Sequence, residues 1–84
     1  MRAAVSERSR LRWLCRRGMK ELDELLGRFL EADYEAAPAA TRAGFERLLE
    51  LPDPELYALL TGRAAAEDPQ LADAVSRIRQ RAGL

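Results

Sequence analysis

An arginine, a glycine and a glutamate stand at fixed spacing early in the chain, as Arg17, Gly18 and Glu21. If this stretch were helical, Arg17 and Glu21 would share a face and could form an exposed ion pair, which contributes only about 0.3–0.5 kcal/mol. Such a pair does not explain Gly18, because a glycine inside a helix costs about 1 kcal/mol relative to alanine. Gly18 therefore either ends a helix or allows another molecule to approach its backbone closely. This cost is the first indication of a functional site.

The chain lacks the residues that most catalytic and metal sites need. It contains no histidine, which removes the commonest general base and the commonest metal ligand. No paired Cys/His spacing and no Ser-base-acid arrangement is present. The many carboxylates are typical of solvated helix faces. No Gly-x-Gly-x-x-Gly fingerprint for a dinucleotide occurs. We therefore expect no catalytic residue, no metal site and no stably bound cofactor in this chain.

Length and composition limit the class of protein. The 84 residues predict one domain, 1–84, with a thin core and no enclosed catalytic cleft. The apolar runs are far too short for a membrane span, and no signal-peptide region is visible. The single cysteine, Cys15, is expected to be a small packed hydrophobe, with a reactive thiol as the alternative. We expect a cytoplasmic bacterial protein that is a monomer when free.

Helix start and stop signals predict the elements that position these residues. One helix is expected from an N-cap at Ser6 to Arg16 or Arg17, with Gly18 as its stop. A second is expected over residues 19–34, because apolar residues recur there at helical spacing. Met19 has an alternative as part of that core stripe, and Glu21 has one as a helix-end charge.

The second half of the chain shows the same kinds of helix start and stop signals. A third helix is expected to end at Glu50, after the weak connection around Pro38. Asp53 and Asp68 each precede a proline and are expected to be the N-caps of a fourth and a fifth helix. Gly62 should end the fourth, and the fifth should run to about residue 81, with Gly83 as its stop. The expected fold class is all-α, a compact bundle of five short helices.

Charge is balanced overall but unevenly distributed, and this suggests a rival function. Residues 1–20 carry a net charge of +6 and residues 21–76 one of −9. The basic start, Trp13 and the basic last helix could contact phosphates, so a small DNA-binding or regulatory helical domain is the alternative. The acidic middle and the zero net charge argue against binding to nucleic acid. Trp13 itself is expected in the core rather than in a contact, which leaves too little apolar surface for membrane binding.

The residues around Gly18 also resemble a family signature. Trp13-x-Cys15 followed by Arg16-Arg17-Gly18-Met19-x-Glu21-Leu22-Asp23 resembles the SdhE-type FAD assembly factors of succinate dehydrogenase and their mitochondrial relatives. The resemblance continues to about residue 79 through Tyr34, Phe45-x-x-Leu48-Leu49-Glu50, Asp53-x-Glu55-Leu56 and Leu60-Thr61-Gly62-Arg63. The Arg-Gly-x-x-Glu pattern alone is weak, but with these flanking residues and the matching length it is specific.

The resemblance implies a function and a set of site residues. It implies a chaperone-like assembly factor, not an enzyme, that binds the flavoprotein subunit of succinate dehydrogenase and possibly that of fumarate reductase. The factor would promote covalent attachment of FAD to a histidine of that subunit, with the FAD carried by the partner. The partner-binding residues would be Arg17, Gly18 and Glu21, supported by Met19 and Asp23. Arg17 would offer its fork of donors to the partner.

Overall fold

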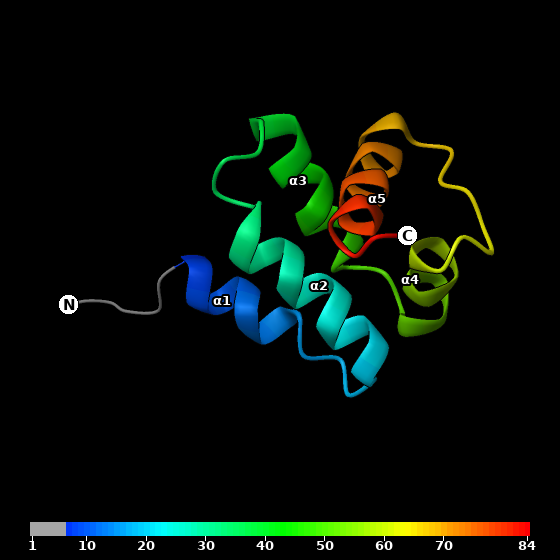
Figure 1. The fold of residues 1–84 in the computed structure, drawn as a ribbon, viewed down its shortest axis with the longest axis horizontal. Helices are drawn as coiled ribbons and strands as arrows, with labels where there is room; N and C mark the ends of the chain where they lie inside the picture. The colour runs from blue at the N-terminus through cyan, green and yellow to red at the C-terminus, as the bar shows by residue number, and fades with distance from the viewer. Residues whose placement is uncertain (1–6) are drawn as a thin grey trace.

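The computed structural model describes residues 7–84 and contains five α-helices over this range. They are α1 (Glu7–Leu14), α2 (Lys20–Ala32), α3 (Ala39–Leu48), α4 (Asp53–Leu60) and α5 (Pro69–Arg81), joined by short connections (Figure 1). No strand occurs among the described residues. The prediction of an all-α fold with five short helices is confirmed.

The helices form two layers that meet at one core. Helix α1 lies along α2 on one side, and α3 packs most extensively against α5 on the other (Figure 1). Helix α2 also packs against α5 and α4, so it connects the two layers. The apolar stripe predicted for α2 faces this core, with Leu22, Leu26, Phe29 and Leu30 buried. The ring centroids of Phe29 and Phe45 lie 5.1 Å apart and join α2 to α3.

Small and polar groups allow α3 and α5 to pack closely. A Cβ added at Gly44 would lie 2.5 Å from the backbone oxygen of Gln70, so only glycine fits at this crossing. Beside it, the buried hydroxyl of Thr41 donates a 2.6 Å hydrogen bond to Asp73 Oδ2. This bond pairs the one polar side chain that is buried among residues 7–84.

Several predicted helix ends are confirmed. Asp68 is the N-cap of α5, and its Oδ1 accepts hydrogen bonds from the backbone N–H groups of Gln70 and Leu71. Gly62 and Gly83 follow α4 and α5 with φ of +82° and +80°, the left-handed conformation expected of a stop. The Ser6 cap lies outside the described residues.

Other predicted ends are wrong. Helix α1 ends at Leu14 rather than Arg16 or Arg17, because the Arg17 backbone N–H bonds to the Asp23 side chain instead of to a helix carbonyl. Helix α2 covers Lys20–Ala32 rather than 19–34, since Met19 has extended backbone angles and the Tyr34 N–H bonds to the carbonyl five residues earlier. Helix α3 ends at Leu48, two residues before the predicted end.

Asp53 is not the N-cap of α4. Pro52 occupies that position, and Asp53 is the first helical residue, with no side-chain capping bond at this end. Its carboxylate instead binds Arg17. The start of the helix was therefore predicted correctly, but the role of the acid was not.

Across residues 7–84, every helix is too short or too polar to cross a membrane.

Candidate functional site

The Arg17-Gly18 pair lies in the connection between α1 and α2, residues 15–19, here called the motif connection. The backbone leaves α1 through an N–H bond from Arg16 to the Trp13 carbonyl, 3.1 Å long. It enters α2 at Met19, whose carbonyl accepts the N–H of Asp23 at 2.9 Å. Arg17 is therefore not helical, and it forms no ion pair with Glu21. Arg17 and Glu21 therefore do not share the helix face considered from the sequence.

Arg17 fixes the motif connection to the rest of the molecule. Its side chain is only 13% exposed, and its Nε donates to Asp53 Oδ1 at 2.8 Å. Its Nη1 donates to the Leu14 and Leu49 carbonyls, at 3.2 and 2.8 Å. Its Nη2 donates to the Leu51 carbonyl at 2.6 Å. Four of the five guanidinium N–H groups are thus bonded within the chain.

These bonds use the donors of Arg17 within the chain. The sequence interpretation expected this fork of donors to face a partner, whereas here it joins the end of α1 to the segment between α3 and α4. The Arg17 side chain thus holds the motif connection in place. A planar guanidinium suits this position because it reaches three carbonyls and a carboxylate at once.

Asp23 holds the same connection from the other side. Its Oδ1 accepts the backbone N–H of Arg17 at 2.7 Å, reaching back from the first turn of α2. A carboxylate in this turn is also favoured by the positive end of the helix dipole. Asp23 and the Arg17 guanidinium together fix the backbone that leads into Gly18.

Gly18 is constrained by its backbone and open to solvent. Its φ is +86°, a conformation that residues with a Cβ rarely adopt. It is exposed, and a Cβ built on it would meet no atom within 4 Å. Gly18 is therefore required by the backbone of this loop, and the space above it is free for a close approach. It does not end α1, because that helix stops at Leu14.

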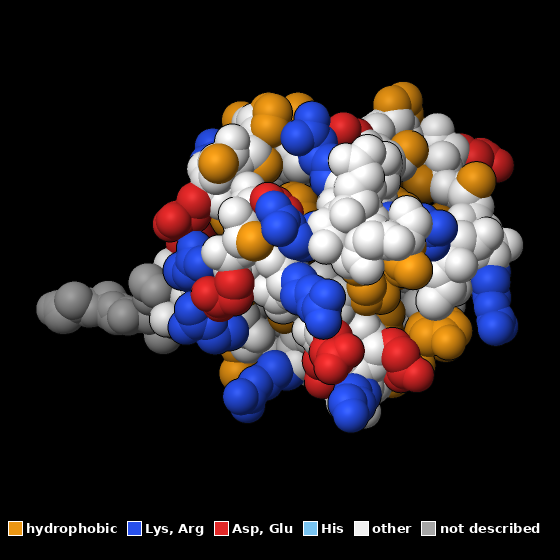
Figure 2. Space-filling model, in the orientation of Figure 1, with side chains coloured by type: hydrophobic (Ala, Val, Ile, Leu, Met, Phe, Trp, Pro, Cys, Tyr) orange, Lys and Arg blue, Asp and Glu red, His pale blue; other side chains and the backbone are white. Residues whose placement is uncertain are grey.

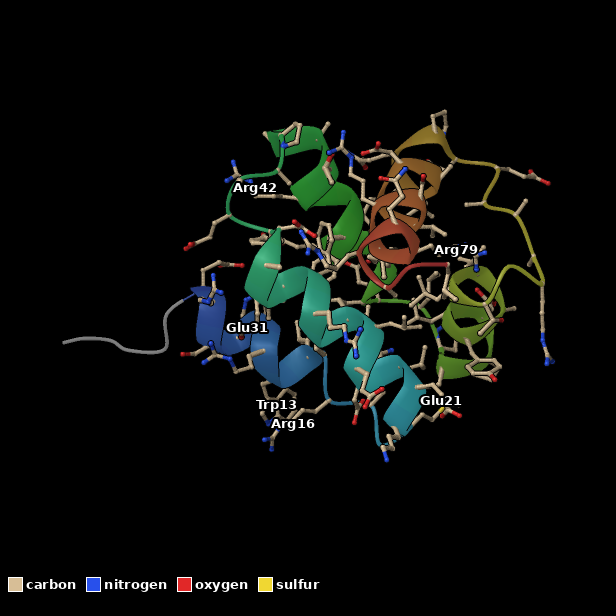
Figure 3. The ribbon with its side chains drawn as sticks, in the orientation of Figure 1. Trp13, Arg16, Glu21, Glu31, Arg42 and Arg79 are labelled. Atoms are coloured by element: carbon tan, nitrogen blue, oxygen red, sulfur yellow. The ribbon has the colours of Figure 1, made fainter. Side chains whose placement is uncertain are left out.

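Glu21 points outward from the first turn of α2 (Figure 3). It is exposed and forms no hydrogen bond or ion pair with any residue of 7–84. Met19 is half-buried and packs against the core, which agrees with the alternative held for it. The motif therefore divides into Arg17 and Asp23, which are bonded within the chain, and Gly18 and Glu21, which face solvent.

Trp13 corrects the sequence interpretation most clearly. It was expected in the core, but it is 72% exposed. The inward side of α1 is formed by Leu11, and Cys15 follows four residues later as the next buried residue. At about 100° per residue, Trp13 lies some 200° round the helix from Leu11 and must face away. In Figure 3, Trp13 and Arg16 project from the lower edge, as does Glu21.

Cys15 is the packed hydrophobe that the sequence predicted. It is 4% exposed, and burial raises the pKa of its thiol to about 12. A thiol with this pKa stays protonated near neutral pH and is a poor nucleophile. Cys15 is therefore part of the packed core beneath the motif connection.

Sequence reasoning missed two residues of the site. Asp53 lies 36 positions from Arg17, and its local signal indicated only a helix start. Arg16 was expected only as a residue at the end of the first helix, but its exposed side chain forms no bond within residues 7–84. A cation without a partner beside an exposed tryptophan could have been suspected only once the faces of α1 were known.

The cationic start of the chain is largely used in contacts with α2 and α3. Arg8 and Arg12 bind Glu31. The hydrogen bond from Arg12 is the largest cause that lowers the pKa of the Glu31 carboxyl, and the bond from Arg8 is the next largest. Arg10 pairs with Glu7 and Glu46. Figure 2 shows blue and red side chains interleaved along this edge. Paired cations attract phosphates weakly, so this edge gives no support to a DNA-binding domain.

The geometry defines a small helical protein with a rigid surface loop, a type of site suited to binding another macromolecule. Within the described residues, no group of three His, Cys, Asp or Glu side chains could hold a metal ion. A family model described as "Flavinator of succinate dehydrogenase" matches residues 9–82. The chain belongs to this family.

Curated relatives agree with this assignment. The chain is 46% identical over 79 residues to the FAD assembly factor SdhE of Methylococcus capsulatus, covering 94% of this chain and 95% of the relative. It is 45% identical over 74 residues to that of Shewanella oneidensis, covering 88% and 90%. The FAD assembly factor SdhE of Yersinia pestis is 35% identical over 77 residues, with 92% and 88% covered. The family resemblance inferred from the sequence is confirmed.

Proposed function

We propose that this chain binds the flavoprotein subunit of succinate dehydrogenase and promotes covalent attachment of FAD to it. Membership of the flavinator family and the names of the relatives support this function. The observation that carries it in this chain is the division of the motif. Arg17 and Asp23 fix the motif connection, so that Gly18 and Glu21 are presented to a partner at little entropic cost.

Each exposed motif residue has a distinct role in this proposal. The bare backbone at Gly18 lets a partner segment approach closely. Glu21 has no partner in its own chain, so it is available to pair with a cation or orient a polar group of the flavoprotein. Met19 supports the turn from its half-buried position. By binding one arrangement of the flavoprotein's flavin-binding region, a rigid loop increases the population of that arrangement.

We place the FAD on the partner rather than on this chain. A hollow of about 500 Å³ on the described surface is lined by segments away from the motif connection, including Phe29, Asp33 and Arg81. The sequence of the chain, the motif connection included, contains no Gly-x-Gly-x-x-Gly fingerprint for a dinucleotide. The chemistry of attachment then belongs to the flavoprotein and its FAD, and this chain is an assembly factor rather than an enzyme. It would work as a cytoplasmic monomer and could also serve the flavoprotein of fumarate reductase.

Reconstitution tests this function directly. Flavoprotein subunit purified without its flavin is mixed with FAD, with and without this chain, and samples are denatured at intervals. Flavin fluorescence that stays with the denatured subunit measures covalent attachment. We expect attachment to be much faster with the chain present. An equal rate in both samples would contradict the proposal.

A further inference from the structure

The surface next to the motif connection carries an exposed aromatic side chain, Trp13, which is not part of the Arg-Gly-x-x-Glu motif. Trp13 is the single tryptophan of the chain, and its side chain is 72% exposed. Among residues 7–84 the one other large apolar side chain with comparable exposure is Leu84, at 62%. The Trp13 indole N–H donates to no residue in this range. Exposed tryptophan is uncommon on proteins without a use for it, because the ring is large and apolar.

Trp13 is continuous with the motif connection. The backbone N–H of Arg16 bonds to the Trp13 carbonyl, so the two residues share the turn that begins the motif connection. In Figure 3 their side chains project below α1, and Glu21 lies further along the lower side of the molecule, at the start of α2. Because Arg16 is part of the motif connection that contains Gly18, a partner surface that covers this connection would also reach the end of α1.

The size of a stable interface also requires contacts beyond the motif. A specific interface buries about 800 Å² per partner and involves roughly 20–30 residues a side. The stretch from Cys15 to Asp23 has nine residues, and several of them are buried or bonded inside the chain. The interface must extend onto neighbouring surface. The exposed end of α1 is adjacent and offers tryptophan and arginine, the residue types most enriched among binding hot spots.

We propose that Trp13 and Arg16 form a second contact with the flavoprotein subunit. Trp13 inserts its ring into an apolar recess of that subunit, and Arg16 pairs with a carboxylate at the rim of the recess. A recess with an acidic rim is the complement of an exposed indole beside an unpaired guanidinium. The contact rests on the proposed function and adds to it an anchor that the Arg-Gly-x-x-Glu pattern does not contain.

A fluorine label on the single tryptophan tests this contact. The chain is prepared with 5-fluorotryptophan, and its ¹⁹F resonance is recorded alone and with unlabelled, flavin-free flavoprotein subunit, in H₂O and in D₂O. We expect the resonance to shift in the complex and to lose the solvent isotope effect of the free chain. A resonance that keeps the isotope effect in a formed complex would overturn the contact. A resonance that shifts with concentration of the chain alone would also overturn it, because a second copy would then cover Trp13.

Matched variants separate this contact from the proposed function. Trp13→Ala should weaken binding to the subunit by roughly tenfold or more, with an unchanged helical spectrum because the ring makes no core contact. Leu84→Ala removes an equally exposed apolar side chain and should bind as the wild type does. Wild-type affinity in Trp13→Ala would overturn the contact while leaving the proposed function intact. Failure of the wild-type chain itself to bind the subunit would overturn both.

Discussion

The motif connection and the connection between α4 and α5, residues 61–68, are built alike but surrounded differently. Each contains a glycine with positive φ, Gly18 or Gly62. Each is held by an arginine side chain that donates to backbone carbonyl groups. Arg17 donates to the carbonyls of Leu49 and Leu51, and Arg79 donates to that of Leu60, next to the 61–68 connection. An anchored turn with a left-handed glycine is therefore a feature of this fold and does not by itself indicate function.

The surroundings of the two connections differ in kind. Around the motif connection lie an exposed indole and charged side chains with no partner in residues 7–84, namely Trp13, Arg16 and Glu21. The 61–68 connection instead presents the short side chains of Ala64, Ala65 and Ala66. Arg63 of this connection lies over the Tyr57 ring, and Glu67 is its one charged side chain without a partner in residues 7–84. The difference shows that function should be sought in the side chains that an anchored turn presents. Matched substitutions in the two connections can test this distinction.

The largest expected effect is a loss of stability on replacing Arg17, compared with replacing Arg79, the arginine that holds the other connection. Arg17→Ala removes four hydrogen bonds and leaves the Leu49 and Leu51 carbonyls and Asp53 without their donor. We expect a loss of about 3 kcal/mol of unfolding free energy, against about 1 kcal/mol for Arg79→Ala, which removes a single bond. Urea unfolding followed by circular dichroism measures both. Equal losses would show that Arg17 does not anchor the motif connection more firmly.

The glycine pair should separate stability from activity. Gly18→Ala and Gly62→Ala each place a Cβ on a residue with φ above +80° and should each cost about 1–2 kcal/mol. At Gly62 the end of the Arg79 side chain must also shift slightly, because the new Cβ would lie 3.1 Å from its Nη1. Only Gly18→Ala should slow flavin attachment beyond its effect on stability, because only Gly18 is proposed to face the partner. Melting curves beside the reconstitution assay measure both quantities. Full activity in Gly18→Ala and in the bulkier Gly18→Arg would exclude this glycine from the binding surface.

A smaller effect is expected at the acid end of the 61–68 connection. The Leu71 N–H, with help from Arg47, lowers the pKa of Asp68. A lowered folded-state pKa means that the stabilisation is complete above the unfolded value of about 3.9 and is lost as pH falls through the folded value. Asp68→Asn keeps a capping oxygen but cannot titrate, so its melting temperature should decline less steeply below pH 4 than that of the wild type. Parallel declines in the two proteins would contradict this role.

Local features of this chain could be predicted from sequence, and distant ones could not. The helix start at Asp68-Pro69 and the helix ends at Gly62 and Gly83 depend on one or two neighbouring residues. The structure confirms all three. The bond between Arg17 and Asp53 spans 36 positions and leaves no local signal. The helix bounds near the motif connection shifted for the same reason, since a side chain of α2 takes the N–H of Arg17.

Burial was predictable only where several apolar residues repeat. The stripe on α2 contains enough of them to define its inward face, and that face is buried. Helix α1 has eight residues and one fully buried side chain, Leu11. Trp13 was expected in the core, but the angle from Leu11 places it on the outer face of this short helix. The position of Trp13 relative to Leu11 around the helix was therefore the better guide to its burial.

The central claim is that Glu21, the exposed acid of the Arg-Gly-x-x-Glu motif, acts on the partner and not on the fold. Glu21 and Glu67 are both exposed and unpaired within residues 7–84, one in the first turn of α2 and the other in the 61–68 connection. Glu21→Ala should change the unfolding free energy by less than about 1 kcal/mol, the limit set by the helix dipole.

The most direct measurement is therefore covalent flavin attachment by Glu21→Ala and Glu67→Ala, assayed side by side with the wild type after melting curves have shown all three to be folded. The account predicts strongly reduced attachment with Glu21→Ala and a wild-type rate with Glu67→Ala. A wild-type rate with Glu21→Ala would contradict the account, because the exposed half of the motif would then have no function.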